Sequence, residues 1–421
     1  MIKKTFEKVR EDVYYEKLEN GVEVYLYPTD KTKNFYLSIS VKYGARINKY
    51  KINNKVYDII PGSAHFLEHK VMALSENPEI SKRINELGSL ANAWTSYYGT
   101  NYNIFGSINL RENLKLLLDI FYNIDINEKC VNEEKGIIGE EIDMYKDQID
   151  SYMSNKILSN LFHNSYIKKT VVGEREDIEK ITAKSLNRIY KDYYGTNNTF
   201  IVVTGNFDKD IILEDIKEYM KNVKSNKKQL PKRIKKKDKE TVCISYEEIK
   251  KDMRNDRVKC AFKIDKKRFN IKNDNLLRYY INIILSNNFS ATSKLYEQYK
   301  NEEIIINMGS NVNIIDDYVI IGVSALTKDA NIFINRIKED ILNISIDEIS
   351  FERKKKLFLK SYILDFDNIE DVEYNISSSV MLENKVDFNE YSMIKDMKYS
   401  VAKDIINNLD FKNYSIIRTI K

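Results

Sequence analysis

The sequence predicts an α+β protein of two similar domains, each with a mostly antiparallel sheet and helices packed on one face. The first observation is the length of 421 residues, which exceeds what one hydrophobic core usually supports. The second is that strand-like and helix-like patterns follow a similar order in both halves of the chain. The third is a basic run between the halves. The predicted domains are residues 1–223 and 241–421, joined by a linker at 224–240.

The first half alternates between two kinds of hydrophobic pattern. Alternating or continuous apolar runs predict strands, and a period near 3.6 residues predicts helices, one of which starts near Pro61. The strand-like ranges are 22–27, 35–43, 91–108 and 199–204. The helix-like ranges are 111–124, 128–153, 183–194 and 211–223.

The second half repeats this order with little residue identity. Its strand-like ranges are 258–264, 304–312 and 318–324, and its helix-like ranges are 276–285, 332–344 and 349–364. Common ancestry of the halves is therefore a hypothesis, and different topologies would rule it out. The basic run, residues 224–239, holds nine Lys or Arg, no aromatic residue and Pro231. It indicates a solvated linker rather than a nucleic-acid-binding face, which would spread its charges over a folded surface.

Other features exclude several classes of protein. The three cysteines, Cys130, Cys243 and Cys260, lie far apart and form no CxxC pair, which argues against disulfides and fits a reducing compartment. No window approaches 18 uninterrupted apolar residues, so we expect a soluble, cytoplasmic protein without a membrane partner. No phosphate-binding loop of the form G-x-x-x-x-G-K-[ST] occurs, which argues against nucleotide-driven chemistry.

Two of the three histidines lie four residues apart, and a glutamate precedes the second. With Ser63 as the expected N-cap, residues i and i+4 share a helix face, so His65 and His69 can reach one metal ion. Zinc binds neutral imidazoles, and a catalytic site keeps one position for water. Glu68 can accept the proton of that water as general base. The alternative is a histidine pair that only packs beneath an apolar helix.

A third ligand is needed, and a carboxylate is usual when only two histidines are present. His163 is a weak candidate, because it lies at a helix end or in a loop. The predicted helix 128–153 places Glu134 and Glu141 two turns apart on one face. Spacing alone does not choose between Glu140 and Glu141, and an ordinary charged outer face remains the alternative.

These residues resemble the pitrilysin/insulinase family of zinc peptidases, which includes the mitochondrial processing peptidases. The resemblance covers most of residues 15–210 and, more weakly, 240–421, and the segment around the motif is most similar to short bacterial members. It implies that His65, His69 and Glu141 bind one Zn²⁺ ion, that Glu68 is the general base, and that Glu134 supports the site from behind. It also implies two pitrilysin-like domains per chain and a clamshell chamber that admits peptides and unfolded segments.

The resemblance further implies that Asn92 and Ala93 lie on an edge strand near the metal. An extended substrate would pair with this strand through its backbone. The alternative is that this segment is an ordinary strand.

The sequence departs from the family pattern in its second half. Lys300 stands where the family has an arginine, and Asn307 where it has a tyrosine; these two residues orient the substrate carbonyl. Lysine lacks the forked guanidinium contact and asparagine lacks the phenol, although Tyr296 or Tyr299 could substitute. We therefore expect a heterodimer whose homologous partner supplies the Arg/Tyr pair, with a homodimer less favoured. The alternatives are a catalytically silent scaffolding subunit and a non-hydrolytic peptide-binding chamber. The natural peptide substrate stays open.

Overall fold

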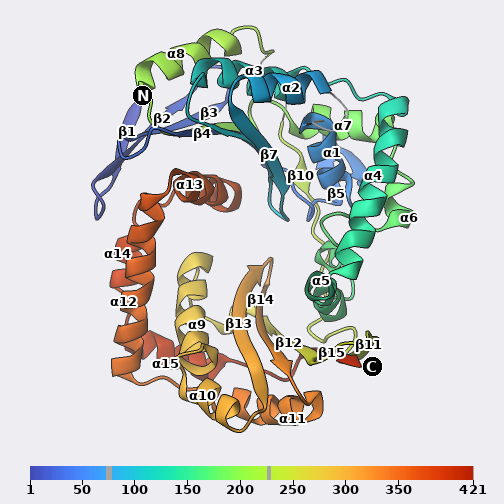
Figure 1. The fold of residues 1–421 in the computed structure, drawn as a ribbon, viewed down its shortest axis with the longest axis vertical. Helices are drawn as coiled ribbons and strands as arrows, with labels where there is room; N and C mark the ends of the chain where they lie inside the picture. The colour runs from blue at the N-terminus through green and yellow to red at the C-terminus, as the bar shows by residue number, and fades with distance from the viewer. Residues whose placement is uncertain (73–77, 225–228, 421) are drawn as a thin grey trace. The chain divides into compact units, whose positions relative to one another are not determined.

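The computed structural model describes residues 1–72, 78–224 and 229–420, which fold into two compact units (Figure 1). Each unit has its own sheet and its own hydrophobic core. Unit 1 comprises Met1–Tyr145, Lys169–Lys235 and Ile363–Asn389. Unit 2 comprises Lys146–Lys168, Lys236–Tyr362 and Glu390–Lys421.

Unit 1 is built on a sheet that, within the described residues, has seven strands in the order β1-β2-β3-β9-β4-β8-β7. All neighbours are antiparallel except β3 and β9, which run parallel. The strands are β1 (Ile2–Phe6), β2 (Glu11–Lys17), β3 (Glu23–Pro28), β4 (Phe35–Val41), β7 (Ser89–Thr95), β8 (Thr100–Gly106) and β9 (Thr199–Gly205). A small second sheet joins β5 (Lys49–Ile52), β6 (Lys55–Asp58) and β10 (Lys232–Arg233).

The helices of unit 1 form a layer on one face of the large sheet. In β4, Leu37, Ile39 and Val41 point into this layer, and in α3 Leu114, Leu117 and Phe121 recur at helical spacing to meet them. The helices are α1 (Ser63–Met72), α2 (Pro78–Glu86), α3 (Leu110–Tyr122), α4 (Glu128–Asp147), α6 (Arg175–Ile178), α7 (Ala183–Tyr193) and α8 (Lys209–Met220).

The opposite face of this sheet carries one helix, α13 (Ile369–Glu383), which packs on β4 and β9 (Figure 1). The alternate residues of β4, Ser38 and Ser40, are fully buried there. The prediction of helices on one face is therefore correct for the main layer but misses α13. The strand face that α13 covers carries polar residues, and in sequence such a face cannot be told from one that faces solvent.

Unit 2 repeats the architecture around a sheet with five strands in the described residues, ordered β11-β15-β12-β14-β13. These are β11 (Tyr246–Lys250), β12 (Asp256–Asp265), β13 (Ile305–Ile315), β14 (Tyr318–Thr327) and β15 (Tyr414–Ile420). The helices are α5 (Ile149–Leu161), α9 (Asp274–Phe289), α10 (Lys294–Asn301), α11 (Ala330–Asp340), α12 (Glu348–Leu364), α14 (Glu390–Lys395) and α15 (Tyr399–Asn408). Short 3-10 turns lie at Tyr166–Lys168, Lys266–Arg268 and Ile341–Asn343 in unit 2, and another lies at Asp365–Asp367 in unit 1.

The two sheets share one topology over five strands. In each unit the first of these strands pairs in parallel with the last, and the next neighbour is antiparallel: β3-β9-β4 in unit 1 and β11-β15-β12 in unit 2. The outer hairpin follows in the same order, β8-β7 and β14-β13. The two halves share this topology, which is compatible with the hypothesis of common ancestry.

Each unit contains one helix from the opposite half of the sequence, so the predicted continuous domains 1–223 and 241–421 differ from the compact units. The predicted helix 128–153 is two helices, because the chain is extended at Gln148. The second of them, α5, packs on β12 and β15 and belongs to unit 2, whereas α13 belongs to unit 1.

The predicted linker 224–240 includes residues 225–228, which lie outside the described residues. Its described part is held at two points. Lys232 and Arg233 form β10 against β5, and Asp238 is buried, with Oδ1 2.9 Å from the ammonium of Lys263.

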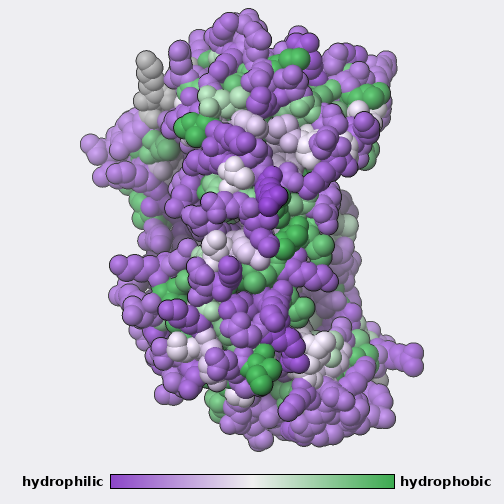
Figure 2. All heavy atoms as spheres, turned by 90° about the vertical axis from the view of Figure 1, so that its left-hand side faces the viewer, coloured by the Kyte–Doolittle hydropathy of each residue, from purple (hydrophilic) through white to green (hydrophobic). Residues whose placement is uncertain are grey.

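The protein face drawn in Figure 2 is mainly hydrophilic, with hydrophobic residues in scattered groups. Among the residues that the structure describes, no helix combines the length and apolarity needed to cross a membrane.

Candidate metal centre and active site

Helix α1 carries the histidine motif, and the backbone before it requires glycine. Gly62 has a φ of +88°, and a Cβ there would lie 2.6 Å from Ile178 Cδ1. The Ser63 hydroxyl donates to the carbonyl of Ile60 at 2.7 Å, so Ser63 is the first helical residue and not the N-cap that the sequence predicted. Phe66 and Leu67 are fully buried and fix the helix on the core.

Three donor groups converge as a zinc site requires. His65 Nε2 lies 3.5 Å from Glu141 Oε1, and His69 Nε2 lies 3.3 Å from Glu141 Oε2. Donors on a tetrahedral zinc ion, with bonds of about 2.0–2.1 Å, are about 3.3–3.4 Å apart. Both imidazole–carboxylate distances are therefore compatible with a zinc ion that His65, His69 and Glu141 would hold.

The structure separates the two candidate carboxylates on α4. The side chain of Glu140 is 85% exposed and lies 3.5 Å from Arg175, whereas Glu141 reaches both imidazoles. His163, the weak candidate, belongs to unit 2, where its Nε2 lies 3.3 Å from the hydroxyl of Thr241.

The electrostatics of the cluster also suit a cation. Burial disfavours the charged imidazole of His69, but the hydrogen bonds that it donates to Glu134 and Glu141 outweigh burial and raise its pKa to about 10. Burial likewise disfavours the Glu141 carboxylate, but His65 and His69 hold its pKa well below the usual range. Two carboxylates thus favour positive charge at this point, and a metal ion would replace the proton.

Glu68 lies beside the histidines and is held from the sheet. One donor atom from each of His65, Glu68 and His69 lies within 4.8 Å of the others. The Thr95 hydroxyl, at the end of β7, donates to Glu68 Oε2 at 2.5 Å. Thr95 was not among the predicted site residues, because residue spacing does not show which strand packs beside which helix.

Glu134 lies behind His69, as the resemblance implies. Its side chain is 1% exposed, and Oε1 lies 2.9 Å from His69 Nδ1. Its other oxygen, Oε2, lies 2.9 Å from the ammonium of Lys70, a residue to which the sequence gave no role. On the turn of α4 between Glu134 and Glu141, Ile138 is buried and Ile137 is 43% exposed.

Tyr145 is a further residue that sequence reasoning missed. It follows Glu141 by one turn of α4, and i, i+4 spacing could have indicated it. Its pKa is raised by burial, then by the charge of Glu141 and a hydrogen bond to that carboxylate.

Asn92 and Ala93 lie on β7, which ends the sheet order among the described strands and pairs there only with β8. The Asn92 side chain is exposed and that of Ala93 half-buried. The predicted edge strand is therefore present, next to the helix that carries the motif.

In unit 2, the positions that depart from the family pattern have partners of their own. Lys300 donates to the carbonyl of Ile306 at 2.6 Å, and the Tyr296 hydroxyl donates to Asn307 Oδ1 at 3.2 Å. Tyr299 is fully buried and donates to Asp340 at 2.5 Å, so it cannot substitute for the missing tyrosine. Tyr296 keeps a phenol beside Asn307.

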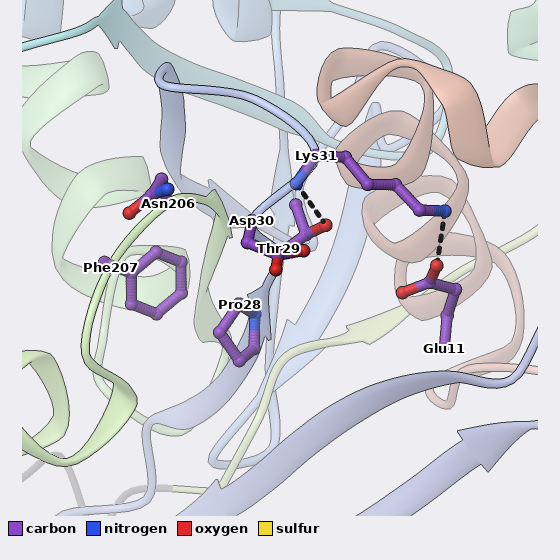
Figure 3. A pocket seen from close by; sticks show the side chains of 7 residues that line it. All are labelled: Glu11, Pro28, Thr29, Asp30, Lys31, Asn206 and Phe207. Atoms are coloured by element: carbon purple, nitrogen blue, oxygen red, sulfur yellow. Dashed lines mark hydrogen bonds and ion pairs between the residues drawn. The ribbon is translucent and has the colours of Figure 1, made fainter.

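Two pockets lie elsewhere in unit 1. One, of about 380 Å³, is lined by the β3–β4 turn and by Asn206 and Phe207, with Lys31 paired to Glu11 (Figure 3). The other, of about 820 Å³, has Tyr122, Tyr190 and Tyr219 in its wall. No predicted site residue lines either pocket.

Known proteins are similar to this chain in sequence and in fold. The family model described as insulinase (peptidase family M16) matches residues 26–175, and that of the peptidase M16 inactive domain matches residues 180–357. The chain is 29% identical to the uncharacterized zinc protease YmfH of Bacillus subtilis, over 69% of this chain and 68% of that one. It is 26% identical to a second B. subtilis protein, the uncharacterized zinc protease YmxG, over 48% of each chain, so this match spans about half of that relative.

A solved structure shows the same fold. The M16-like peptidase of Alicyclobacillus acidocaldarius superimposes with a TM-score of 0.90 at 22% identity, over 97% of this chain and 98% of that one. These matches confirm the resemblance inferred from the histidine motif and the two predicted α+β domains. The chain belongs to the insulinase family of peptidases, family M16.

Proposed function

We propose that this protein is a zinc-dependent endopeptidase that hydrolyses peptides or unfolded segments. The observation that carries the proposal is the convergence of His65, His69 and Glu141 at the spacing of a tetrahedral zinc site, with a separate carboxylate beside them. The similarity to two B. subtilis relatives that are named as zinc proteases supports it.

A zinc ion bound there supplies a Lewis acid that polarises a peptide carbonyl and makes water acidic enough to lose a proton near pH 7. Glu68 accepts that proton, and the Thr95 hydroxyl on Oε2 leaves Oε1 open to receive it. The same carboxyl group then donates the proton to the leaving amine. Glu134 accepts a hydrogen bond from His69 Nδ1, which turns Nε2 toward Glu141.

The substrate backbone would add to β7 at Asn92 and Ala93. An extended peptide at this edge satisfies backbone groups that no described strand pairs. This mode favours extended, unfolded segments over folded proteins, and it suits a chamber of the kind that the family resemblance implies.

Catalysis would need a homologous partner, in a heterodimer in which this chain is the catalytic subunit. Lys300 and Asn307 offer neither the forked guanidinium nor the phenol that would hold the developing oxyanion. Tyr296 is the residue of this chain that could replace part of that function. Full peptidase activity of the purified chain alone would contradict the heterodimer, whereas activation by a co-expressed homologue would support it.

The test of the function compares three proteins for zinc content and for cleavage of an unfolded polypeptide. The wild type should contain zinc and cleave, with its partner present if needed. Glu68→Gln should keep zinc and lose turnover, and His65→Ala should lose both. Zinc-loaded wild type without turnover, alone and with the partner, would favour the second candidate, a silent scaffolding or peptide-binding subunit. The description of the second family model as an inactive domain is the observation that keeps this candidate in view.

The cytoplasm is the proposed compartment, supported by three cysteines that are all free in the structure. Cell fractionation with an antibody to the chain would test it.

A further inference from the structure

Lys70 is buried directly beside the metal-binding helix face. It follows His69 on α1, and its side chain is only 2% exposed. Burial of a charged ammonium is costly unless a counter-charge and hydrogen bonds compensate for it. Such a residue either stabilises packing between two helices or serves the adjacent site.

The contacts of Lys70 lead to the site. Its ammonium lies 2.9 Å from Glu134 Oε2 and donates to the carbonyl of Cys130 at 3.2 Å. Both partners are on α4, one turn apart. Glu134 Oε1 in turn lies 2.9 Å from His69 Nδ1. The ammonium, the carboxylate and the imidazole therefore form one buried chain across α1 and α4.

This arrangement leaves the carboxylate little freedom to turn. One oxygen is occupied by the cation and the other by the imidazole, and the side chain of Glu134 is 1% exposed. Orientation of a ligating histidine by a hydrogen-bonded carboxylate typically matters 10–100-fold for metal affinity. A group that fixes the carboxylate should share part of that effect.

We propose that Lys70 is a positioning residue for the zinc site, acting through Glu134. The ammonium holds Oε1 of Glu134 on His69 Nδ1, and Nε2 of His69 is thereby aimed at Glu141. The inference rests on the proposed function, since it assigns a role toward a bound zinc ion. A positioning role differs from a packing role because it predicts that the loss of zinc affinity in Lys70→Met depends on the presence of Glu134.

The experiment measures the dissociation constant of zinc for the full chain. A chromophoric chelator competes with the protein for zinc, which is the only ligand added. The proteins are the wild type, Lys70→Met, Glu134→Gln and the double variant. Lys70→Met keeps the length of the side chain without its charge and should weaken zinc binding about tenfold. Glu134→Gln should weaken it at least as much. The double variant should bind zinc as Glu134→Gln does, because Lys70 then has no carboxylate to orient.

A control separates position from general stability. Lys42→Met removes another lysine of unit 1, whose ammonium lies 3.3 Å from Glu23 on the sheet, and should leave the dissociation constant unchanged. The Co²⁺-loaded proteins give a second readout: the visible absorption bands of Lys70→Met should shift as those of Glu134→Gln do.

Two results would overturn the inference. One is wild-type zinc affinity in Lys70→Met. The other is a loss from Lys70→Met that is equally large in the Glu134→Gln background. If Lys70→Met alone does not fold, the double variant still decides: zinc affinity equal to that of Glu134→Gln supports the inference, and a further loss overturns it. Failure of the wild type to bind zinc would overturn the proposed function as well, so the two failures are distinguishable.

Discussion

Two glutamates of unit 1, Glu134 and Glu373, are equally buried and have opposite surroundings. Each is 1% exposed. Glu134 on α4 meets a lysine ammonium and a histidine imidazole. Glu373 on α13 accepts hydrogen bonds from the hydroxyl of Ser377 at 2.5 Å, the amide of Asn101 at 3.0 Å and the hydroxyl of Ser38.

The difference shows how surroundings separate a functional carboxylate from a structural one. A lysine ammonium on one oxygen and an imidazole N–H on the other suit a carboxylate that orients a metal ligand. Neutral donors suit a carboxyl group that attaches α13 to the sheet, and burial raises the pKa of Glu373 accordingly. Burial alone would have placed both residues in one class.

The largest expected effect is on catalysis, and it should differ between the candidate metal site and the surroundings of Glu373. Glu68→Gln, beside the metal ligands, should lower kcat about 100- to 10,000-fold with zinc content unchanged, because the proton acceptor is lost. Glu373→Gln should leave kcat and zinc content within about twofold. Steady-state kinetics and metal analysis on the same preparations measure both. A large loss of kcat in Glu373→Gln would break the comparison.

The next effect is on stability. Glu373→Ala leaves Ser38, Asn101 and Ser377 without their shared acceptor and should reduce the free energy of unfolding by about 3 kcal/mol. Urea denaturation followed by circular dichroism measures it. Lys209→Ala, at a surface pair with Asp210, is the matched control and should leave the free energy of unfolding nearly unchanged. Equal effects of the two variants would contradict a structural role for Glu373.

A smaller effect on kcat is expected from Thr95, which contacts the proposed general base Glu68. Thr95→Val removes the hydroxyl that donates to Glu68 while keeping the shape of the strand residue. A hydrogen bond to a charged group contributes about 1.5 kcal/mol or more, which corresponds to about a tenfold loss in kcat. The dissociation constant for zinc should not change, since Thr95 contacts the base and not the ligands. An altered zinc affinity with normal kcat would mean that Thr95 acts on the metal instead.

The smallest effect is a pH dependence. Burial raises the pKa of Glu373, although Ser377, Ser38 and Asn101 partly offset it. A raised folded-state pKa means that the folded chain binds this proton more tightly than the unfolded chain. The resulting stabilisation is complete below the ordinary glutamate pKa of about 4.3 and is lost as pH rises through the folded value.

The free energy of unfolding of the wild type, relative to that of Glu373→Gln, should therefore decrease as pH rises above about 4. Denaturation at several pH values measures it. An advantage that grows with pH would show that Glu373 is charged in the folded protein.

Sequence patterns predicted the features that depend on local order. Alternating, continuous and helical apolar patterns found β4, β9, α3 and α7 nearly to the residue, because each packs apolar side chains on the core of unit 1. The histidine motif predicted the proposed ligands on α1, since i, i+4 spacing places both side chains on one helix face. The resemblance was needed to choose Glu141 over Glu140.

Long-range contacts were not predictable from spacing. Nothing in the pattern of Ser38, Ser40 and Asn101 shows that α13, more than 250 residues later, covers them. Lys70 was missed because a lysine beside a motif is usually solvated, and only the fold places Glu134 next to it. The exchanged helices α5 and α13 likewise depend on packing that no local signal encodes.

The central claim is that His65, His69 and Glu141 hold one zinc ion. The most direct test measures zinc per chain after gel filtration in the wild type, Glu141→Gln and Glu140→Gln. The two substitutions are at adjacent positions of α4. The account predicts about one zinc in the wild type and in Glu140→Gln, and far less in Glu141→Gln. Zinc-free wild type, or the same zinc content in both variants, would contradict it.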